Sequence, residues 1–453
     1  MTGANPPNII FMHSHNTGRF IQPYGHAVPT PNMLRLAQEG VLFRQAFCTA
    51  PTCSPSRASF LTGMYPHSCG MYGLGHRGFK MTNFHHHVVC TLAKHGYHTA
   101  LAGVEHTSSD PTKVGYCELL STDDTNYPEF SDTRHPVHAT VNFLNQVHDK
   151  PFFVSLGLNV THRPFPTPDP TNHLAEDARY CIPPPPLPDV PEIREDMAGF
   201  KASARQMDDS YGTVMDALDA NGLAENTLVC CFTDHGLQFP RHMSNLEDTG
   251  IAVYLIIRGP GGFSGGQIID EMVSLMDLVP TVYSLVGIPV PPFVEGVPLQ
   301  PLVNGDGNSL HEAIFAESNY HAAYEPMRCV RTRRHKLIRR YDDRDRPNLP
   351  NVDDTNSKKF LLTQGWRDQT RDQELLYDLV FDPYETNNLI DLPIMKDVTE
   401  DLRLRLESWM YETDDPLLKG DHVPVPSEAV TNDPDGESPN EPVIPIGRET
   451  TFI

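Results

Sequence analysis

Short apolar runs alternate with stretches of helical spacing along the N-terminal part of the chain. A continuous run of roughly four to eight apolar residues predicts a buried strand, whereas apolar residues three and four positions apart predict a helix. This alternation is typical of an α/β sheet with helices on its faces. We expect strands at 8–12, 98–103, 151–158 and 227–232, and helices at 31–39, 199–222 and 270–289.

Polar residues follow directly after each of these four strands. The stretches are "HSHNTGR" (13–19), "VEH" (104–106), "NVTHR" (159–163) and "TDHG" (233–236). Ligands of open α/β sheets bind at the carboxyl ends of the strands, so we expect the four loops to converge on one pocket. Any single histidine is more often an exposed or packing residue, but the repetition after four strands favours a shared site.

The segment "CSPSRASFLTG" predicts a short helix with an anion-binding start. Ser54 is a good N-cap, Pro55 suits the first helical position and Gly63 ends the helix. Cys53 then lies at the helix N-terminus, where free N–H groups and the helix dipole favour negative charge, and Arg57 lies one turn further on. Two interpretations stay open: an anion site around Cys53 and Arg57, or a buried thiol without a chemical role.

Composition narrows the class of protein. A chain of 453 residues is long enough for a large core and a smaller second domain. Nine cysteines without a CxxC pair indicate neither a disulfide framework nor a zinc ribbon. The start of the chain does not resemble a signal peptide and no apolar stretch is long enough to span a bilayer, so we expect a cytoplasmic protein without a membrane partner. A net charge of −23 excludes general nucleic-acid binding.

The helix segment also carries a family resemblance. Cys53-Ser-Pro-Ser-Arg57 followed by Leu61-Thr-Gly63 resembles the sulfatase signature C-x-P-S-R-x-x-x-L-T-G at every fixed position. The stretches "PNIIFM", "TPNMLRLAQEGVLFRQAF" and "FTDHG" resemble further blocks of that family, in the same order. The chain is therefore identified as a member of the type I sulfatase family of the alkaline phosphatase superfamily. Later stretches, including "MYGL", "PMRCV" and "WMYETDDP", look most like its N-sulfoglucosamine sulfohydrolase (sulfamidase) branch.

The resemblance implies a fold and an activity. The expected fold is a mixed, largely parallel sheet sandwiched by helices, with a smaller C-terminal α+β domain built on an antiparallel sheet and a helix at 395–412. Because "VNGDGNS" predicts a loop, we place the catalytic domain at 1–308 and the smaller domain, with an extended tail, at 309–453. The expected reaction is hydrolysis of a sulfate ester or N-sulfate, on a sugar or another small molecule. Two alternatives stay open: a phosphodiester or phosphonate monoester hydrolase on the same fold, and a non-catalytic anion-binding relative.

Catalytic roles follow from the same resemblance. It implies that a formylglycine-generating enzyme oxidises Cys53 to formylglycine (3-oxoalanine), whose hydrate attacks sulfur. Arg57 is expected to hold that diol, and His106 to bind or orient it. His162 is expected to bind a sulfate oxygen or to protonate the leaving group. A homo-oligomer is a further expectation that the sequence leaves open.

The expected metal site departs from the family pattern. Sulfatases usually supply two adjacent aspartates and an Asp-Asn pair, a carboxylate-rich set that suits calcium. The corresponding positions here are His15, Asn16, Asp234 and His235, with the oxidised Cys53 as a further ligand. One carboxylate, one amide and two imidazoles favour Mn²⁺, Fe²⁺ or Zn²⁺ over Ca²⁺. We expect one divalent metal, and the alternative is a metal-free relic.

Substrate-binding candidates come from three further segments. Both lysines of the family pattern are absent, and Arg241 and His242 lie close enough in sequence to replace one of them. His76 and Arg77 lie in a Gly-rich polar segment that either lines the pocket or forms an exposed loop. The basic run 328–341, which begins at Arg328, predicts a strand with one solvated face and a surface that steers a polyanionic sugar, although such runs are often only solvated.

Overall fold

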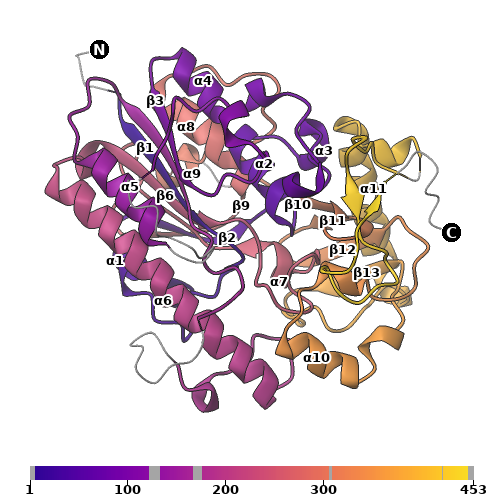
Figure 1. The fold of residues 1–453 in the computed structure, drawn as a ribbon. Coiled ribbons are helices and arrows are strands. Elements are labelled where there is room, and N and C mark those ends of the chain that lie inside the picture. The colour runs from indigo at the N-terminus through magenta and orange to yellow at the C-terminus, as the bar shows by residue number, and fades with distance from the viewer. Residues whose placement is uncertain (1–5, 122–132, 167–175, 306–308, 421, 447–453) are drawn as a thin grey trace.

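The computed structural model describes residues 6–121, 133–166, 176–305, 309–420 and 422–446. Within these residues a nine-stranded mixed sheet forms the centre of the larger, N-terminal lobe (Figure 1). Its strands are β1 (Asn8–Ser14), β2 (Val41–Phe47), β3 (His98–Gly103), β4 (Glu118–Leu119), β5 (Phe152–Gly157), β6 (Thr227–Thr233), β7 (Ala252–Val253), β8 (Leu255–Arg258) and β9 (Gln267–Ser274). They lie in the order β4-β3-β5-β1-β6-β8-β2-β7, and β9 pairs with β2.

The four predicted strands form the parallel centre of this sheet. β1 pairs in parallel with β5 and β6, and β3 pairs in parallel with β5. Every residue of β1, β5 and β6 is buried, as expected for strands that are covered on both faces. β8 and β7 run antiparallel to their partners, so the sheet is mixed. The expected α/β class is confirmed, and the carboxyl ends of these strands open at one edge.

Helices lie on both sides of the sheet (Figure 1). They are α1 (Pro31–Glu39), α2 (Cys53–Thr62), α3 (Pro66–Cys69), α4 (Val88–Lys94), α5 (Arg134–Leu144), α6 (Pro191–Ala220), α7 (Asp248–Ile251), α8 (Leu278–Val286) and α9 (Gln300–Val303). α1 begins after Thr30 and ends at Gly40, as predicted, whereas α6 begins before the expected position 199. Among the described residues, no helix has the length and apolar character needed to cross a membrane.

The prediction of one helix at 270–289 is right only for its second half, which forms α8 and ends at Gly287 as expected, whereas its first half is a strand. Exposure alternates along the first half of β9, which is the period of a strand, and the strand continues to Ser274. Ser274 then caps a short 3-10 turn: its Oγ accepts from the Met276 N–H over 3.4 Å, and Asp277 Oδ2 accepts from the Ser274 N–H over 2.8 Å. This capping box ends the strand and leads into α8.

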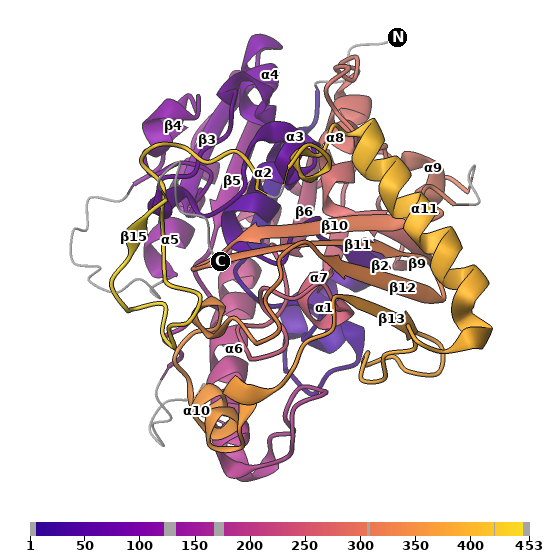
Figure 2. The ribbon, with the colours of Figure 1, turned by 90° about the vertical axis from the view of Figure 1, so that its right-hand side faces the viewer.

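The C-terminal part is a smaller antiparallel sheet with helices and an extended tail. Its strands follow the order β10-β11-β12-β13, and Figure 2 shows α11 lying along this sheet. The elements are β10 (Ile314–Tyr320), β11 (Tyr324–Arg331), β12 (His335–Arg340), α10 (Asn356–Thr363), β13 (Glu374–Asp378), α11 (Lys396–Glu412), β14 (Val430–Thr431) and β15 (Ile444–Pro445). The expected antiparallel sheet and its helix are confirmed.

The small sheet is buried on both faces. Ile314, Met327 and Ile338 belong to the hydrophobic core of the large lobe, whereas Leu402 and Trp409 of α11 pack in a second core with the opposite face. Both lobes therefore share one continuous interior. The division at 308/309 stays a prediction, and part of the expected boundary loop (306–308) lies outside the described residues.

The basic run at 328–341 is not a single strand with a solvated face. Residues 332–334 form a turn that separates β11 from β12, and all residues of β11 are buried. The buried arginines are tolerated because each has carboxylate partners: Arg328 binds Asp415, and Arg331 binds Asp248. A run of basic residues therefore does not by itself indicate a solvated face, because the carboxylates that neutralise these arginines come from distant parts of the chain.

Candidate active site

Polar side chains from four loops meet at the carboxyl edge of the parallel strands. The rings of His106 and His162, which follow β3 and β5, have centroids 5.1 and 5.2 Å from that of His15, which follows β1. The Asn16 N–H donates to Asp234 Oδ1 over 2.9 Å and so joins the loop after β1 to the loop after β6. The four loops thus converge at one place.

Cys53 lies within this group as the first residue of α2. Its Sγ is 3.3 Å from His235 Nε2 and 3.9 Å from Asn16 Oδ1, and the side chain is almost fully buried. Cys53, Asp234 and His235 form one group of potential ligand atoms within 4.8 Å of one another, and His15, Cys53 and His106 form another. The thiol therefore faces residues from three different loops.

The start of α2 differs from the sequence prediction by one residue. Thr52, rather than Ser54, occupies the N-cap position, so Cys53 is inside the first turn. Ser54 Oγ instead accepts a hydrogen bond from the Gly75 N–H over 3.0 Å. The end of the helix at Gly63 is as predicted, because that glycine takes the left-handed conformation with φ 73°.

Arg57 is locked beneath the site. Its Nη2 donates to Asp234 Oδ2 over 3.0 Å, and its Nη1 donates to His13 Nδ1 over 2.9 Å. Because a guanidinium only donates, His13 Nδ1 is an acceptor, and its Nε2 donates to Ser155 Oγ over 3.0 Å. Arg57 has no exposed surface, so its side chain has a single fixed geometry.

Two residues of the site adopt an uncommon backbone conformation. Asn16 has φ 56° and His106 has φ 69°, both in the left-handed region. Residues other than glycine seldom occupy this region, and those that do cluster at functional sites. The turns after β1 and β3 are therefore shaped by the position of these two side chains.

Burial favours the uncharged forms of His15, His106, His235 and the Cys53 thiol. Burial and the nearby Arg57 lower the pKa of His15 well below its usual value and that of His106 to about 3, and burial also lowers the pKa of His235. Burial and the Asp234 carboxylate raise the pKa of the Cys53 thiol well above its usual value. The unmodified thiol is thus a poor nucleophile, whereas the neutral imidazoles are in the form that binds metals.

The unpaired atoms of this site fit a bound cation. His15 Nδ1 and Nε2 are buried and make no hydrogen bond among the described residues. The Asn16 amide oxygen, the atom of that side chain that can bind a cation, lies 3.9 Å from Cys53 Sγ. His15 Nε2 nevertheless lies 3.2 Å from Asp234 Oδ2. Buried polar groups normally have partners, so potential ligands that approach closely without bonding indicate room for an ion between them.

His76 and Arg77 lie beside the site. The His76 and His106 rings are 6.1 Å apart, centroid to centroid. Arg77 Nη1 donates to the Ala322 carbonyl over 3.5 Å and Nη2 to the Pro439 carbonyl over 3.4 Å. Arg77 therefore joins the site to the C-terminal part, and its cation is not paired with a carboxylate in these contacts.

Arg241 and His242 belong to different surroundings. Arg241 is exposed and lines a separate cavity of about 260 Å³ with Asn348 and Trp366. His242 is buried, packs near Phe20 and donates from Nδ1 to the Pro240 carbonyl over 3.0 Å. The structure contradicts the prediction that these two replace a missing lysine beside Cys53, because Arg241 lines that separate cavity and His242 is buried near Phe20.

The prediction that Arg328 binds substrate is also wrong. Its guanidinium has no exposed surface and donates to both carboxylate oxygens of Asp415, over 2.5 and 3.0 Å. Nη1 donates in addition to Asn319 Oδ1 and to two backbone carbonyls. All donors of this side chain are thus directed to the protein interior.

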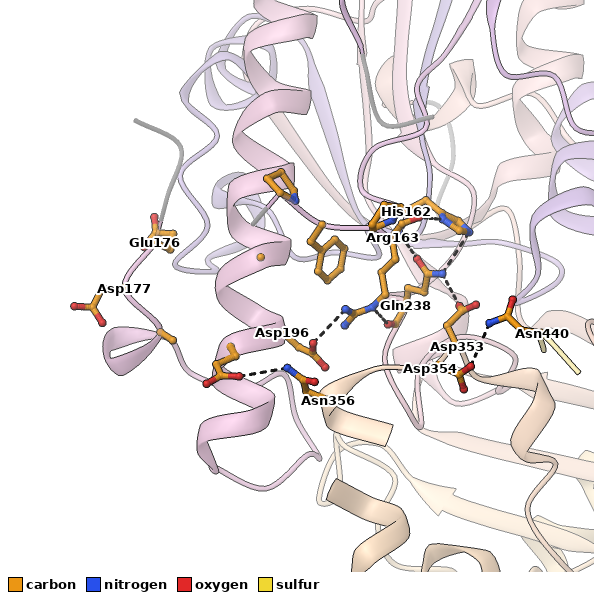
Figure 3. A pocket seen from close by; sticks show the side chains of 16 residues that line it. His162, Arg163, Glu176, Asp177, Asp196, Gln238, Asp353, Asp354, Asn356 and Asn440 are labelled. Atoms are coloured by element: carbon orange, nitrogen blue, oxygen red, sulfur yellow. Dashed lines mark hydrogen bonds and ion pairs between the residues drawn. The ribbon is translucent and has the colours of Figure 1, made fainter. Parts of the chain in front are cut away.

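Sequence reasoning missed one wall of the site. A cavity of about 930 Å³ begins at His162, and its lining includes Gln238 and Asp353 (Figure 3). The one sequence signal that could have pointed to this cavity was the position of Gln238, four residues after Asp234. Asp353 comes from the C-terminal part, and nothing in the sequence distinguishes it among the 58 acidic residues.

Comparison with known proteins gives the family. Residues 7–288 match the sulfatase family, and residues 234–359 match the C-terminal region of N-sulphoglucosamine sulphohydrolase. The human N-sulphoglucosamine sulphohydrolase is 28% identical, with 92% of each chain covered. An ulvan-active sulfatase of Formosa agariphila is 26% identical, over 89% of this chain and 74% of the relative.

A solved structure supports the fold. A protein in complex with its substrate D-glucosamine-2-N,6-O-disulfate superposes with a TM-score of 0.72 at 20% identity, over 92% of this chain and 100% of that chain. The sulfatase match covers more than half of the chain and includes the four loops and α2. The chain therefore belongs to the sulfatase family, a family of sulfuric ester hydrolases, and carries the C-terminal region typical of its N-sulphoglucosamine sulphohydrolase branch.

Proposed function

We propose that this chain hydrolyses a sulfate ester or N-sulfate of an amino sugar, with formylglycine derived from Cys53 as the nucleophile. The observation that carries the proposal is the position of Cys53, at the start of α2 and within 4.8 Å of ligand atoms from Asp234 and His235. The match to the N-sulphoglucosamine sulphohydrolase C-terminal region and the human relative support an amino sugar as the substrate class.

The neutral thiol explains why a modified side chain is needed. A sulfate ester is anionic and a poor electrophile, so its cleavage requires an activated nucleophile and compensation of charge. A buried Cys53 whose pKa is raised does not supply a thiolate. The hydrated aldehyde supplies one hydroxyl that attacks sulfur and a second that allows the sulfate to be released. A formylglycine-generating enzyme is the maturation partner that this proposal requires.

The side chains of the site then have distinct roles. Arg57, held by Asp234 and His13, directs positive charge at the side chain of residue 53. His106 orients that side chain from the loop after β3. His162 borders the cavity and donates a proton to the leaving oxygen or nitrogen, and Arg77, next to His76, binds the substrate.

The donor set selects the cation. His15, Asp234 and His235, whose ligand atoms belong to two groups that share Cys53, would hold one divalent metal together with the nearby Asn16 amide oxygen. When bound, the metal would polarise the sulfate oxygens and activate the nucleophile. Two imidazoles and a single carboxylate favour Mn²⁺, Fe²⁺ or Zn²⁺ over the calcium suggested by family resemblance. Elemental analysis of protein purified without added metal tests this choice: one equivalent of a transition metal is expected, and calcium alone would show the choice to be wrong.

Parallel assays test the function as a whole. Protein from a host that converts Cys53, with conversion shown by a peptide mass about 18 Da lower, is given N-sulfoglucosamine, an aryl sulfate and an aryl phosphate diester. We expect release of sulfate from the first two and its loss in Cys53→Ala. Strong preference for the diester would instead identify a phosphodiesterase, and no turnover by converted protein would identify an anion binder. The cytoplasmic location and an oligomeric state stay predictions.

A further inference from the structure

Gln238 connects His162 to the C-terminal part of the chain. It lies in the loop after β6 and is 2% exposed. Its Nε2 is 3.3 Å from His162 Nε2 and hydrogen-bonds to Asp353 Oδ2, while its Oε1 accepts from the Arg163 N–H over 2.7 Å. The same amide thus contacts the histidine, the loop that carries the histidine and a carboxylate from the other lobe (Figure 3).

The neighbouring groups fix the protons of this network. A backbone N–H only donates, so the Gln238 atom that faces Arg163 is the oxygen, and the atom shared by His162 and Asp353 is the NH₂ group. His162 Nδ1 lies 2.6 Å from the Arg163 carbonyl, which only accepts, so Nδ1 carries a proton. In the neutral imidazole, Nε2 is then the acceptor, and Gln238 donates to it.

The geometry also separates the two ends of the imidazole. Nδ1 is hydrogen-bonded to the carbonyl of the next residue, Arg163. Nε2 lies on the side of Gln238 and Asp353, which line the same cavity as His162. In the proposed function the leaving group occupies this cavity and therefore meets Nε2. The 3.3 Å contact is the longest in the network, so it is the contact that gives way when Nε2 carries the proton to be donated.

We propose that Gln238, anchored by Asp353, is a positioning residue that holds the His162 ring with Nε2 toward the leaving-group side of the cavity. The inference rests on the proposed function, because it assigns His162 to the leaving group. Gln238 acts through His162, while the other hydrogen bonds of its amide go to Arg163 and Asp353. The smaller lobe therefore helps to orient a catalytic group of the larger lobe.

A leaving-group series tests this role. A misaligned proton donor slows poor leaving groups more than good ones, because a good leaving group departs without help. Gln238→Met removes the amide at similar volume, and Asp353→Ala removes its anchor alone. For Gln238→Met we expect a loss in kcat/KM that is roughly tenfold greater for phenyl sulfate than for 4-nitrophenyl sulfate, and a smaller loss of the same kind for Asp353→Ala.

The controls separate positioning from folding and from the proposed function. Gln364→Met makes the same change at an exposed glutamine of α10's C-terminal end and should leave the series unchanged. Equal losses for all leaving groups in Gln238→Met, or no loss, would overturn the positioning role. Failure of wild-type converted protein on both aryl sulfates and on N-sulfoglucosamine would instead overturn the proposed function.

A spectroscopic measurement tests the geometry without turnover. Two-bond ¹H–¹⁵N correlation spectra report which ring nitrogen carries the proton, and His162→Gln identifies the signals. We expect the Nδ1-protonated form in both proteins, because the Arg163 carbonyl stays in place, and a shift of the His162 Nε2 resonance in Gln238→Met, because Nε2 loses its donor. An Nε2-protonated neutral ring in the wild type, or an unchanged Nε2 resonance in the variant, would overturn the inference whether or not the protein hydrolyses aryl sulfates.

Discussion

Replacement of Arg328 by methionine should destabilise the fold and leave substrate affinity unchanged. The guanidinium has no exposed surface and lies between two carboxylates that are also fully buried. Nε and Nη2 are 2.5 and 3.0 Å from the oxygens of Asp415, and Nη2 is 3.4 Å from Glu317 Oε2. Methionine occupies similar space without charge, so both carboxylates lose this cation.

The size of the effect depends on what each carboxylate retains. Glu317 keeps a hydrogen bond from His67 Nδ1 over 2.8 Å and one from Asn319 Nδ2 over 3.0 Å. Asp415 keeps the Leu417 N–H over 3.0 Å. Asp415 therefore becomes an almost uncompensated buried charge, and breaking such a pair costs about 3–5 kcal/mol in the free energy of unfolding.

Urea unfolding and steady-state kinetics measure the two effects separately. Arg328→Met should unfold at lower urea, while the folded fraction keeps the wild-type KM for an aryl sulfate. The double variant Arg328→Met, Asp415→Leu should recover part of the loss, because an apolar pair often replaces a buried ion pair at little cost. A loss below about 1 kcal/mol, the level of an exposed pair, or a raised KM at unchanged stability would refute the interior role of Arg328.

Three further changes test other parts of the structure. Arg57→Lys should lower kcat/KM for an aryl sulfate by about 100-fold at nearly unchanged Tm, because one ammonium cannot bridge Asp234 and His13 as the guanidinium does. Retained activity would contradict the role of the guanidinium. The Glu317 carboxylate raises the pKa of His67 above 6.5, so this stabilisation is complete below pH 6.5 and is lost as the pH rises through the raised pKa. The difference in Tm between wild type and His67→Asn should therefore be larger at pH 6 than at pH 9, and an equal difference would count against a charged His67. Arg241→Ala should keep kcat/KM within roughly twofold, since this exposed side chain lines another cavity; a larger loss would return Arg241 to the active site.

The reactive end of the site could be predicted from sequence because its residues follow local rules. Buried apolar runs identified the parallel strands, and the residues directly after them, such as His15 and Asp234, had to lie at one edge of the sheet. The environment of Arg328 could not be predicted, because the carboxylate that neutralises it is 87 positions away. The Gln238–Asp353 contact is equally non-local, with 115 positions between its partners. Local sequence pattern thus located the residues around Cys53, whereas the cavity beside His162 depends on how the two lobes pack.

The charges around Cys53 nearly cancel, and this explains why a bound cation would matter for holding an anionic sulfate group. Arg57 is matched by Asp234 at 3.0 Å, and burial favours the neutral forms of His15 and His235, so these four groups beside Cys53 contribute little net charge. The chain as a whole carries −23 and repels an anion at long range. A sulfate group can then be held only by positive charge inside the site. In the proposed function Arg77 supplies one such charge, and a divalent ion held by His15 and the neighbouring ligand atoms would supply the larger share. Loss of a site ligand should accordingly weaken sulfate binding more than any change of surface charge.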